Sequence, residues 1–244
     1  MSRRLGCAVL FVALAGWLPM LPSVAAPFWY KWDGSRYPEE DPGWFRLWGN
    51  HQGPQQGQSN RTLINGTLEF NNVHDVGLYD GVHQNFYGTL NPAPGEVFIA
   101  KWRLRVDQVV GNPIYPYDPS LGLFGDDGWG TGFSHGVDRV KVGIFYSTSV
   151  IVPFAPYVFH AYEMRTWDMR TFEFYLDGNL AHVGPLDHPV TSGYVAWGDS
   201  VVGSGSKAAW DYFEMGVRTE VPEPSGLMMA IMLALHRARW SRSK

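Results

Sequence analysis

The chain has almost no cysteine: Cys7 is the only one among its 244 residues, and it lies in the first apolar run. A disulfide needs two thiols and a thiolate zinc site needs several, so both are excluded for the domain that follows. This domain must be stabilised by a packed apolar core. The roughly 195 residues between the two ends of the chain are enough to build one.

Catalytic signatures are missing as well. The sequence contains no Gly-x-Ser-x-Gly nucleophile elbow, no His-Glu-x-x-His zinc motif and no phosphate-binding loop. Its eight histidines are scattered, and none forms a close metal-ligand pair. No stretch of about 10–12 residues in the domain carries a helical period of apolar residues. These absences predict a non-catalytic, non-helical domain without a certain cofactor.

Basic residues are scarce outside the two ends of the chain. The whole chain has a formal net charge of −4, but residues 26–220 hold 22 acidic and 13 basic side chains, which gives that segment a net charge of −9. Nucleic-acid-binding domains carry basic patches, so an acidic domain argues against a nucleic-acid partner.

The N-terminal end has the layout of a secretory signal peptide. Two arginines precede an apolar run from Leu5 to Leu18. This run is shorter than the roughly 20 apolar residues that a transmembrane helix needs. Small residues at Ser23 and Ala25 then fit the −3 and −1 positions of a cleavage site before Ala26. We expect residues 1–25 to form a signal helix that is removed on export.

The C-terminal end combines three features over residues 221–244. Val221, Pro222, Glu223 and Pro224 come first, followed by an apolar run and a basic tail without an acid. Proline cannot donate a backbone hydrogen bond and favours an extended neighbour, so the first feature should be an accessible strip. The apolar run has about half of the 20 residues that span a bilayer, which predicts a short hydrophobic helix. The alternative is a frayed amphipathic end.

This order of features resembles the PEP-CTERM sorting signal of Gram-negative bacteria that carry an exosortase. The resemblance implies that the exosortase and the secretion machinery are partners, with the enzyme acting at the Pro222–Pro224 region. It also implies transient membrane association through the C-terminal helix. The destination would be the cell surface or the extracellular matrix.

The domain begins with an aromatic, proline-rich and glycine-rich segment, residues 26–61. Its tryptophans are interspersed with turn residues, and its Gln-rich part has no periodicity. We expect the segment to pack on the β-sandwich that follows. Trp44 and Trp48 are candidate residues for stacking on a sugar ring.

Residues 62–220 carry strand patterns with turn signals between them. Asn65-Gly66 supplies the two positive-φ positions of a tight hairpin turn within 62–70. From Phe98 to Val106 apolar residues alternate with mostly basic ones, as in a half-buried strand. Similar alternation is found in 140–146, 160–166 and 172–176, and further strands are expected at 194–197 and 210–217. The fold class predicted is all-β: an antiparallel β-sandwich of the jelly-roll type.

A glycine-dense loop interrupts these strands at residues 125–132. Asp126 and Asp127 are paired carboxylates among glycines, and carboxylate oxygens are ligands that calcium prefers. Calcium is therefore a candidate ligand of this loop, but the spacing matches no EF-hand loop, and the alternative is a plain solvated loop. Trp129 lies between glycines and is a candidate for stacking on a sugar ring.

Four segments together carry a second resemblance: 159–164, 172–178, 197–200 and 210–213. They resemble the concanavalin A-like lectin/glucanase (laminin-G-like) superfamily, whose fold hosts lectins, hydrolases, lyases and adhesion modules. Catalytic members of its glucanase branch place alternating acids, Glu-x-Asp-x-x-Glu, on one strand, and this chain has no such run. Glu173 and Asp177 are four residues apart, about 13 Å along a strand, which is too far for a retaining pair. Asp177 is better explained by a turn.

Three functions remain open. The first is an exported, non-catalytic surface or matrix protein that binds exopolysaccharide through a lectin-like sandwich. The second is a divergent glycan-active hydrolase or lyase whose acids come from separate loops, such as Asp126, Asp127, Asp199 or Asp211. The third is a purely structural or adhesion component without a small ligand.

Overall fold

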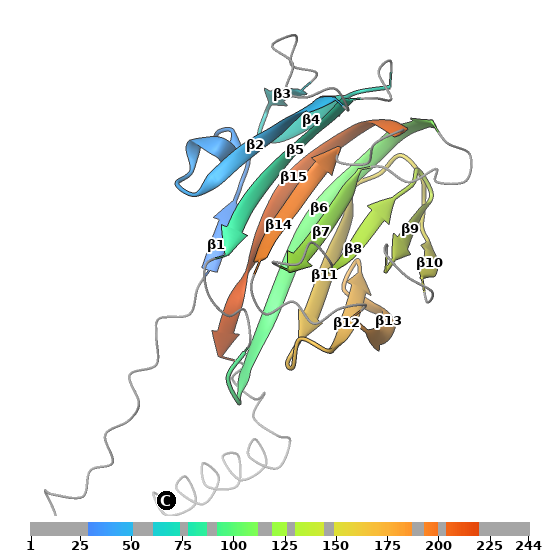
Figure 1. The fold of residues 1–244 in the computed structure, drawn as a ribbon. Coiled ribbons are helices and arrows are strands. Elements are labelled where there is room, and N and C mark those ends of the chain that lie inside the picture. Colours follow the sequence, from blue (N-terminus) through green and yellow to red (C-terminus); the bar gives the residue numbers. More distant parts are fainter. Residues whose placement is uncertain are drawn as a thin grey trace, which may run out of the picture.

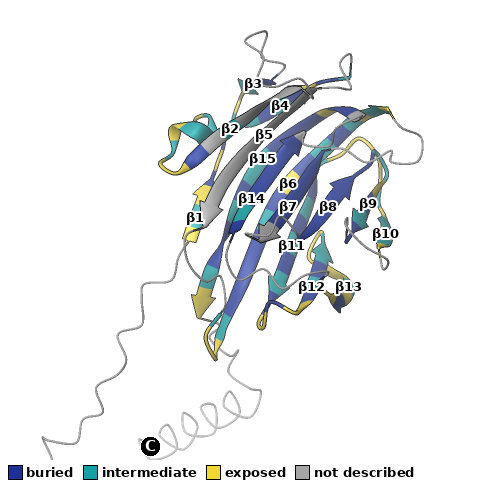
Figure 2. Cartoon of the chain, in the orientation of Figure 1, coloured by how far each residue is buried: buried dark blue, intermediate teal, exposed yellow. Residues whose placement is uncertain are grey.

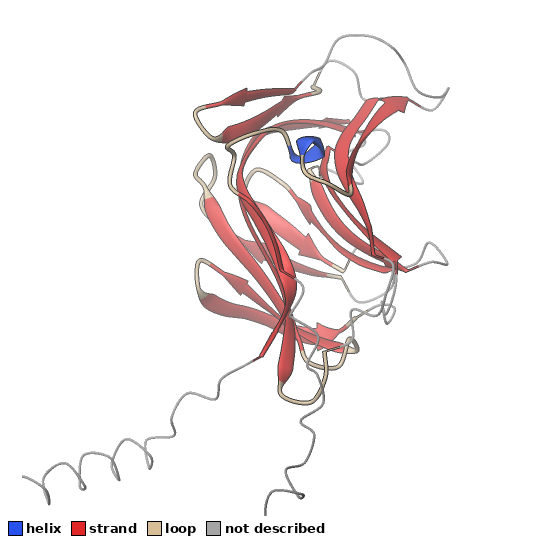
Figure 3. Ribbon diagram, turned by 90° about the vertical axis from the view of Figure 1, so that its left-hand side faces the viewer, coloured by secondary structure: helices blue, strands red, loops and turns tan. Residues whose placement is uncertain are grey.

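The structure, a computed structural model, describes residues 29–50, 61–73, 78–86, 92–111, 119–125, 130–143, 149–186, 193–199 and 204–219. These residues form two layers of antiparallel strands (Figures 1 and 3) and one 3-10 turn, η2 (Pro38–Glu40). The predicted all-β antiparallel sandwich of the jelly-roll type is therefore confirmed. The helices expected at the two ends of the chain lie outside the described residues.

The first sheet has eight strands in the order β13-β12-β11-β6-β15-β4-β3, with β1 as a further partner of β15. The second sheet has seven strands in the order β10-β9-β8-β7-β14-β5-β2. The strands of the first sheet are β1 (Trp29–Trp32), β3 (Arg61–Ile64), β4 (Thr67–Asn71), β6 (Glu96–Gly111), β11 (His160–Thr166), β12 (Thr171–Leu176), β13 (Asn179–Pro185) and β15 (Ser204–Thr219). Those of the second are β2 (Trp44–Asn50), β5 (Leu78–Phe86), β7 (Ser120–Gly125), β8 (Gly130–His135), β9 (Arg139–Val142), β10 (Val150–Pro153) and β14 (Gly193–Asp199).

The buried residues, dark blue in Figure 2, lie along the strands of both sheets, and their side chains form a core rich in aromatic rings. Trp102 of β6 stacks on Tyr162 of β11, with ring centroids 5.5 Å apart and planes inclined by 11°. Across the layers, Phe133 of β8 stacks on Phe174 of β12 at 5.2 Å. Burial of such large rings from alternating strand positions is the main stabilising term in a domain without disulfides.

The strand predictions with clear alternation are confirmed. The predicted hairpin is β3 and β4, and Asn65 and Gly66 have φ values of 51° and 80°. Strand β6 extends beyond the predicted range, because Glu96–Gly111 pairs along most of its length with β15. Its apolar face is buried and Arg103 on the other face is exposed, as expected for a half-buried strand.

The later strand predictions also hold where the structure describes them. Strand β11 alternates between buried and half-buried residues along its whole length, and β12 buries the two phenylalanines of its apolar face. The turn after β12 is formed by Asp177 and Gly178, with φ values of 51° and 79°. Both residues have the positive φ that a type I′ hairpin turn requires. Of the strand expected at 140–146, residues 144–146 lie outside the described part.

The aromatic N-terminal segment does more than pack on the sandwich. Its residues 29–32 form β1, which pairs with residues 213–216 of β15 in the first sheet. Its residues 44–50 form β2, which pairs with β5 at one end of the second sheet. The segment expected to pack on the sandwich therefore contributes a strand to each layer.

His135, at the end of β8, is fully buried between the layers. Its Nε2 accepts a hydrogen bond from Trp102 Nε1–H at 3.1 Å, and its Nδ1 lies 2.9 Å from the carbonyl oxygen of Pro119. The neutral ring with a proton on Nδ1 satisfies both contacts. Burial lowers the pKa of His135 from 6.5 to about 4, so the imidazole stays neutral in the folded domain.

His160 and Asp177 join two turns of the first sheet. His160 Nδ1 lies 2.7 Å from Asp177 Oδ2, and Asp177 Oδ1 accepts the Ala161 backbone N–H at 2.9 Å. The other ring nitrogen, Nε2, lies 2.7 Å from the carbonyl oxygen of Ala155. Because both ring nitrogens contact protein acceptors, the histidine has no nitrogen left for a substrate. This pair is a structural link, which confirms the interpretation of Asp177 as a turn residue.

Candidate functional site

A pocket of about 350 Å³ lies beside β1, at the end of the sandwich where the N-terminal segment joins the first sheet. Its volume falls within the range of small-molecule binding pockets, about 300–1,000 Å³. It is lined by Trp29, Tyr30, Lys31, Trp32, Asp33, Ser35, Arg36, Asp41 and Pro42. Among the described residues β1 pairs only with β15, so its other edge faces away from the sheet.

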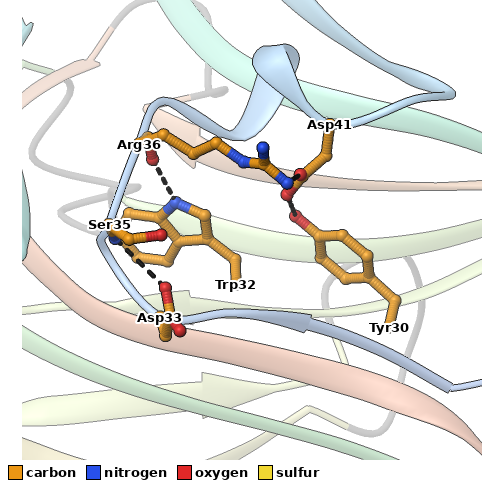
Figure 4. A network of polar contacts seen from close by, with 6 residues as sticks. All are labelled: Tyr30, Trp32, Asp33, Ser35, Arg36 and Asp41. Atoms are coloured by element: carbon orange, nitrogen blue, oxygen red, sulfur yellow. Dashed lines mark hydrogen bonds and ion pairs between the residues drawn. The ribbon is translucent and has the colours of Figure 1, made fainter.

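The pocket contains a network of polar contacts (Figure 4). Arg36 forms an ion pair with Asp41, and the Tyr30 hydroxyl donates to the same carboxylate at 3.4 Å. Trp32 Nε1–H donates to the carbonyl oxygen of Arg36 at 2.7 Å, which fixes the loop that carries the guanidinium. The network places a planar cation and a carboxylate next to two aromatic rings.

The protonation states in the pocket follow from these contacts. A hydrogen bond from Ser35 holds the pKa of the exposed Asp33 carboxyl below its usual range; the backbone N–H of Ser35 donates to Asp33 Oδ1 at 3.1 Å. Burial, with the nearby Asp41 carboxylate, raises the pKa of the Tyr30 hydroxyl well above its usual value. At neutral pH Asp33 is therefore a carboxylate that can accept hydrogen bonds, and Tyr30 keeps the proton that it donates to Asp41.

The loop that carries these residues is anchored to the β3–β4 hairpin. Gly34 has a φ of 76°, and a Cβ atom at this position would lie 1.8 Å from the carbonyl oxygen of Gly66. The guanidinium of Arg61, at the start of β3, forms an ion pair with Glu39 of η2 and lies over the Tyr37 ring at 5.1 Å. These contacts connect the pocket rigidly to the first sheet.

Trp29 forms the exposed aromatic wall of the pocket. Its side chain is 39% exposed although it lies on a strand, and the Arg218 guanidinium lies 5.8 Å from its ring centroid. A large exposed ring beside hydrogen-bonding groups is suited to a ligand with one apolar face and several hydroxyl groups.

The prediction for Trp44 as an exposed sugar-stacking residue is wrong. Its side chain is 3% exposed and belongs to the core. Tyr30 covers it at a ring distance of 4.4 Å, and Phe213 contacts it edge-on at 5.9 Å. Trp44 therefore supports the Tyr30 ring from the core side.

The other predicted site residues lie outside the part of the chain that the structure describes. Trp48 is in β2, but its side chain is not described. The same limit applies to the loop residues Trp129, Asp126 and Asp127, to Ala25 and Ala26 at the signal cleavage site, and to the sorting motif Val221, Pro222, Glu223 and Pro224.

Two of the acids weighed in the sequence analysis are described, and each contacts a neighbouring side chain. Asp211, one acid of the enzyme hypothesis, forms an ion pair with Arg103 at 2.6 Å on the outer face of the first sheet. Glu173 accepts a hydrogen bond from the neighbouring Tyr175 hydroxyl. Asp199 lies in β14 without a described side chain. Within the described residues, no group of three His, Cys, Asp or Glu side chains is placed to hold a metal ion.

No helix in the described ranges is both long and apolar enough to cross a membrane. The segment expected to associate with the membrane, 221–244, is not among them.

Sequence reasoning did not single out the pocket residues Tyr30, Asp33, Arg36 and Asp41. One signal was available: residues 29–36 read Trp-Tyr-Lys-Trp-Asp-Gly-Ser-Arg, an aromatic-rich run followed by an Asp-Gly turn. That pattern predicts a strand that ends in a polar turn. It does not predict that Asp41 folds back onto Tyr30.

Comparison with known proteins supports the fold. No family model and no curated protein matches this chain. Among solved structures, the carbohydrate esterase from the Shiga toxin-encoding bacteriophage phi24B is 10% identical, covers 79% of this chain and 100% of its own, and has a TM-score of 0.52. The β-glucanase of Bacillus licheniformis is 14% identical, with coverages of 79% and 98% and a TM-score of 0.47.

The binding domain of botulinum neurotoxin serotype G is 12% identical and matches 71% of this chain with a TM-score of 0.43. Our chain spans only 44% of that structure. The likeness to the phage esterase, together with the sheet order, defines the class as an antiparallel two-sheet β-sandwich.

Proposed function

We propose that this protein is an exported, non-catalytic surface or matrix protein, and that its concanavalin A-like sandwich binds polysaccharide through the pocket beside β1. The observation that carries the proposal is the joint presence of an exposed tryptophan, Trp29, and the Arg36–Asp41 pair in one open pocket. A pyranose ring offers an apolar face to stack and hydroxyl groups that both donate and accept. The pocket supplies a partner for each of these features.

The non-catalytic part of the proposal is supported by the described carboxylates. Glycoside hydrolysis needs two carboxyl groups that flank one bond, free to exchange protons with substrate and water. In the pocket Asp41 is tied to Arg36 and Tyr30, and Asp33 to Ser35. Acids committed to such contacts are suited to holding hydroxyl groups.

Replacing Trp29 with alanine tests the binding site. We expect the affinity of the protein for exopolysaccharide from its producing organism to fall at least about tenfold, since a tryptophan at the centre of a contact commonly contributes this much or more. Isothermal titration calorimetry with the full chain gives the affinity. The matched control is Trp167→Ala, because Trp167 is 38% exposed and lies in the turn between β11 and β12. Equal losses in both variants would contradict the assignment.

Export and sorting are proposed from the two ends of the chain. Residues 1–25 would direct export, and the Pro222–Pro224 region would be the site of exosortase action. Deleting residues 221–244 should leave the protein in the periplasm of an exosortase-carrying host, as measured by cell fractionation. Unchanged delivery to the surface would show that the tail does not sort the protein.

A further inference from the structure

We infer that the pocket beside β1 selects an uncharged pyranoside and discriminates against uronates and other anionic sugars. The inference rests on the proposed function and names the class of ligand for the same site. It follows from the charge balance inside the pocket, the ion pair that one of its two cationic groups, Arg36, forms with Asp41, and the charge of the whole domain.

The pocket lining has no excess of positive charge. Its charged members are two cations and two anions: Lys31, Arg36, Asp33 and Asp41. Ser35 holds Asp33 as a carboxylate, and Figure 4 shows Asp33 on the other side of Trp32 from Asp41. A carboxylate or sulfate on a sugar would therefore meet carboxylates on both sides of the pocket, and like charges at close range repel.

The guanidinium of Arg36 is also unavailable as an anion clamp. Binding an acidic sugar bidentately would require it to leave Asp41. The Asp41 side chain is only 14% exposed, so its carboxylate would then lose its cation in a half-buried position, which is unfavourable. An uncharged ligand needs no such exchange. The Arg36 side chain is 54% exposed. Its N–H groups that do not face Asp41 can therefore donate to hydroxyl groups of the sugar while the ion pair stays in place.

The net charge of the whole domain also disfavours binding of anionic sugars. Residues 26–220 carry a net charge of −9, and a polyanionic chain approaching the pocket is repelled at distances up to about 8 Å at physiological salt. Neutral polysaccharides feel no such repulsion.

The test compares oligosaccharides of equal length. Neutral glucose-, galactose- and mannose-based oligosaccharides and a uronate oligomer are titrated into the full chain at low and at high salt. We expect at least one neutral series to bind with an affinity that salt changes less than twofold, and the uronate oligomer to bind at least tenfold more weakly. Tighter binding of the uronate would overturn the inference but leave the proposed glycan-binding function intact. Absence of binding by every oligosaccharide would overturn both.

Two variants connect this selectivity to the pocket. Arg36→Gln should lower the affinity for the neutral ligand at least tenfold. The control is Arg139→Gln. Arg139 begins β9, is 47% exposed and forms an ion pair with Asp138, so this variant should leave the affinity for the neutral ligand unchanged. Asp33→Asn keeps a side chain that can accept the turn hydrogen bond but removes one negative charge, so it should shift the preference toward the uronate several-fold. An unchanged preference in Asp33→Asn would count against the charge argument.

Discussion

Replacing Gly34 with alanine is expected to lower the free energy of unfolding by about 3 kcal/mol or more and to abolish glycan binding. Two costs combine at this position. A non-glycine residue at the φ of 76° found here costs about 1–2 kcal/mol. The added Cβ would also overlap the Gly66 carbonyl oxygen, 1.8 Å away, and forcing such contacts apart typically costs a further 1–3 kcal/mol.

The loss of binding follows from where Gly34 lies. To relieve the overlap, the loop must move away from the β3–β4 hairpin, and it carries Ser35 and Arg36 with it. The matched control is Gly66→Ala. Gly66 has a φ of 80°, but a Cβ there meets nothing within 4 Å, so only the backbone cost of about 1–2 kcal/mol applies. Chemical denaturation measures both variants, and equal destabilisation would contradict the close contact between loop and hairpin.

Acid is expected to destabilise the domain through His135. Its pKa is about 4 in the folded state and about 6.5 when unfolded, so between these values the unfolded chain binds a proton that the folded domain excludes. The stability contribution is fully present above pH 6.5 and is lost as the pH falls to 4. At 1.36 kcal/mol per pKa unit, the loss is about 3 kcal/mol.

The variant His135→Gln isolates this effect. Glutamine does not titrate, and its amide can donate to the Pro119 carbonyl and accept from Trp102 in the same way as the neutral ring. We expect the difference in unfolding free energy between the protein and this variant to change by about 3 kcal/mol from pH 7 to pH 4. His182→Gln, on the edge strand β13, controls for loss of a histidine. Parallel curves for the protein and His135→Gln would show that the buried ring accepts the proton.

Much of the fold could be predicted because local chemistry decides it. Strands β6, β11 and β12 each have one buried face and one partly solvated face. Apolar and polar residues therefore tend to alternate along their sequences. The turns at Asn65-Gly66 and Asp177-Gly178 need positive φ, and few residues accept it. In each case the constraint acts on neighbours in sequence, and a single sequence records it.

The site could not be predicted in the same way. Trp44 follows Pro42 and Gly43, as an exposed stacking residue could, but in the fold the rings of Tyr30 and Phe213 pack on it and bury it. The pocket depends on contacts between distant positions: Arg61 with Glu39, and Gly34 with Gly66. No periodicity or turn rule connects such pairs, because they are set by how the loop folds back on the sheet.

The central claim is that the pocket beside β1 binds the glycan. Chemical-shift mapping on isotope-labelled full-length protein, titrated with a neutral oligosaccharide, tests it most directly. We predict that the largest shifts occur at the Trp29 indole and at the backbone amides of residues 30–41, and that they saturate together with the calorimetric isotherm. Saturating shifts confined to other residues, such as the Asp126–Asp127 loop or the outer face of the first sheet around Arg103, would contradict the account.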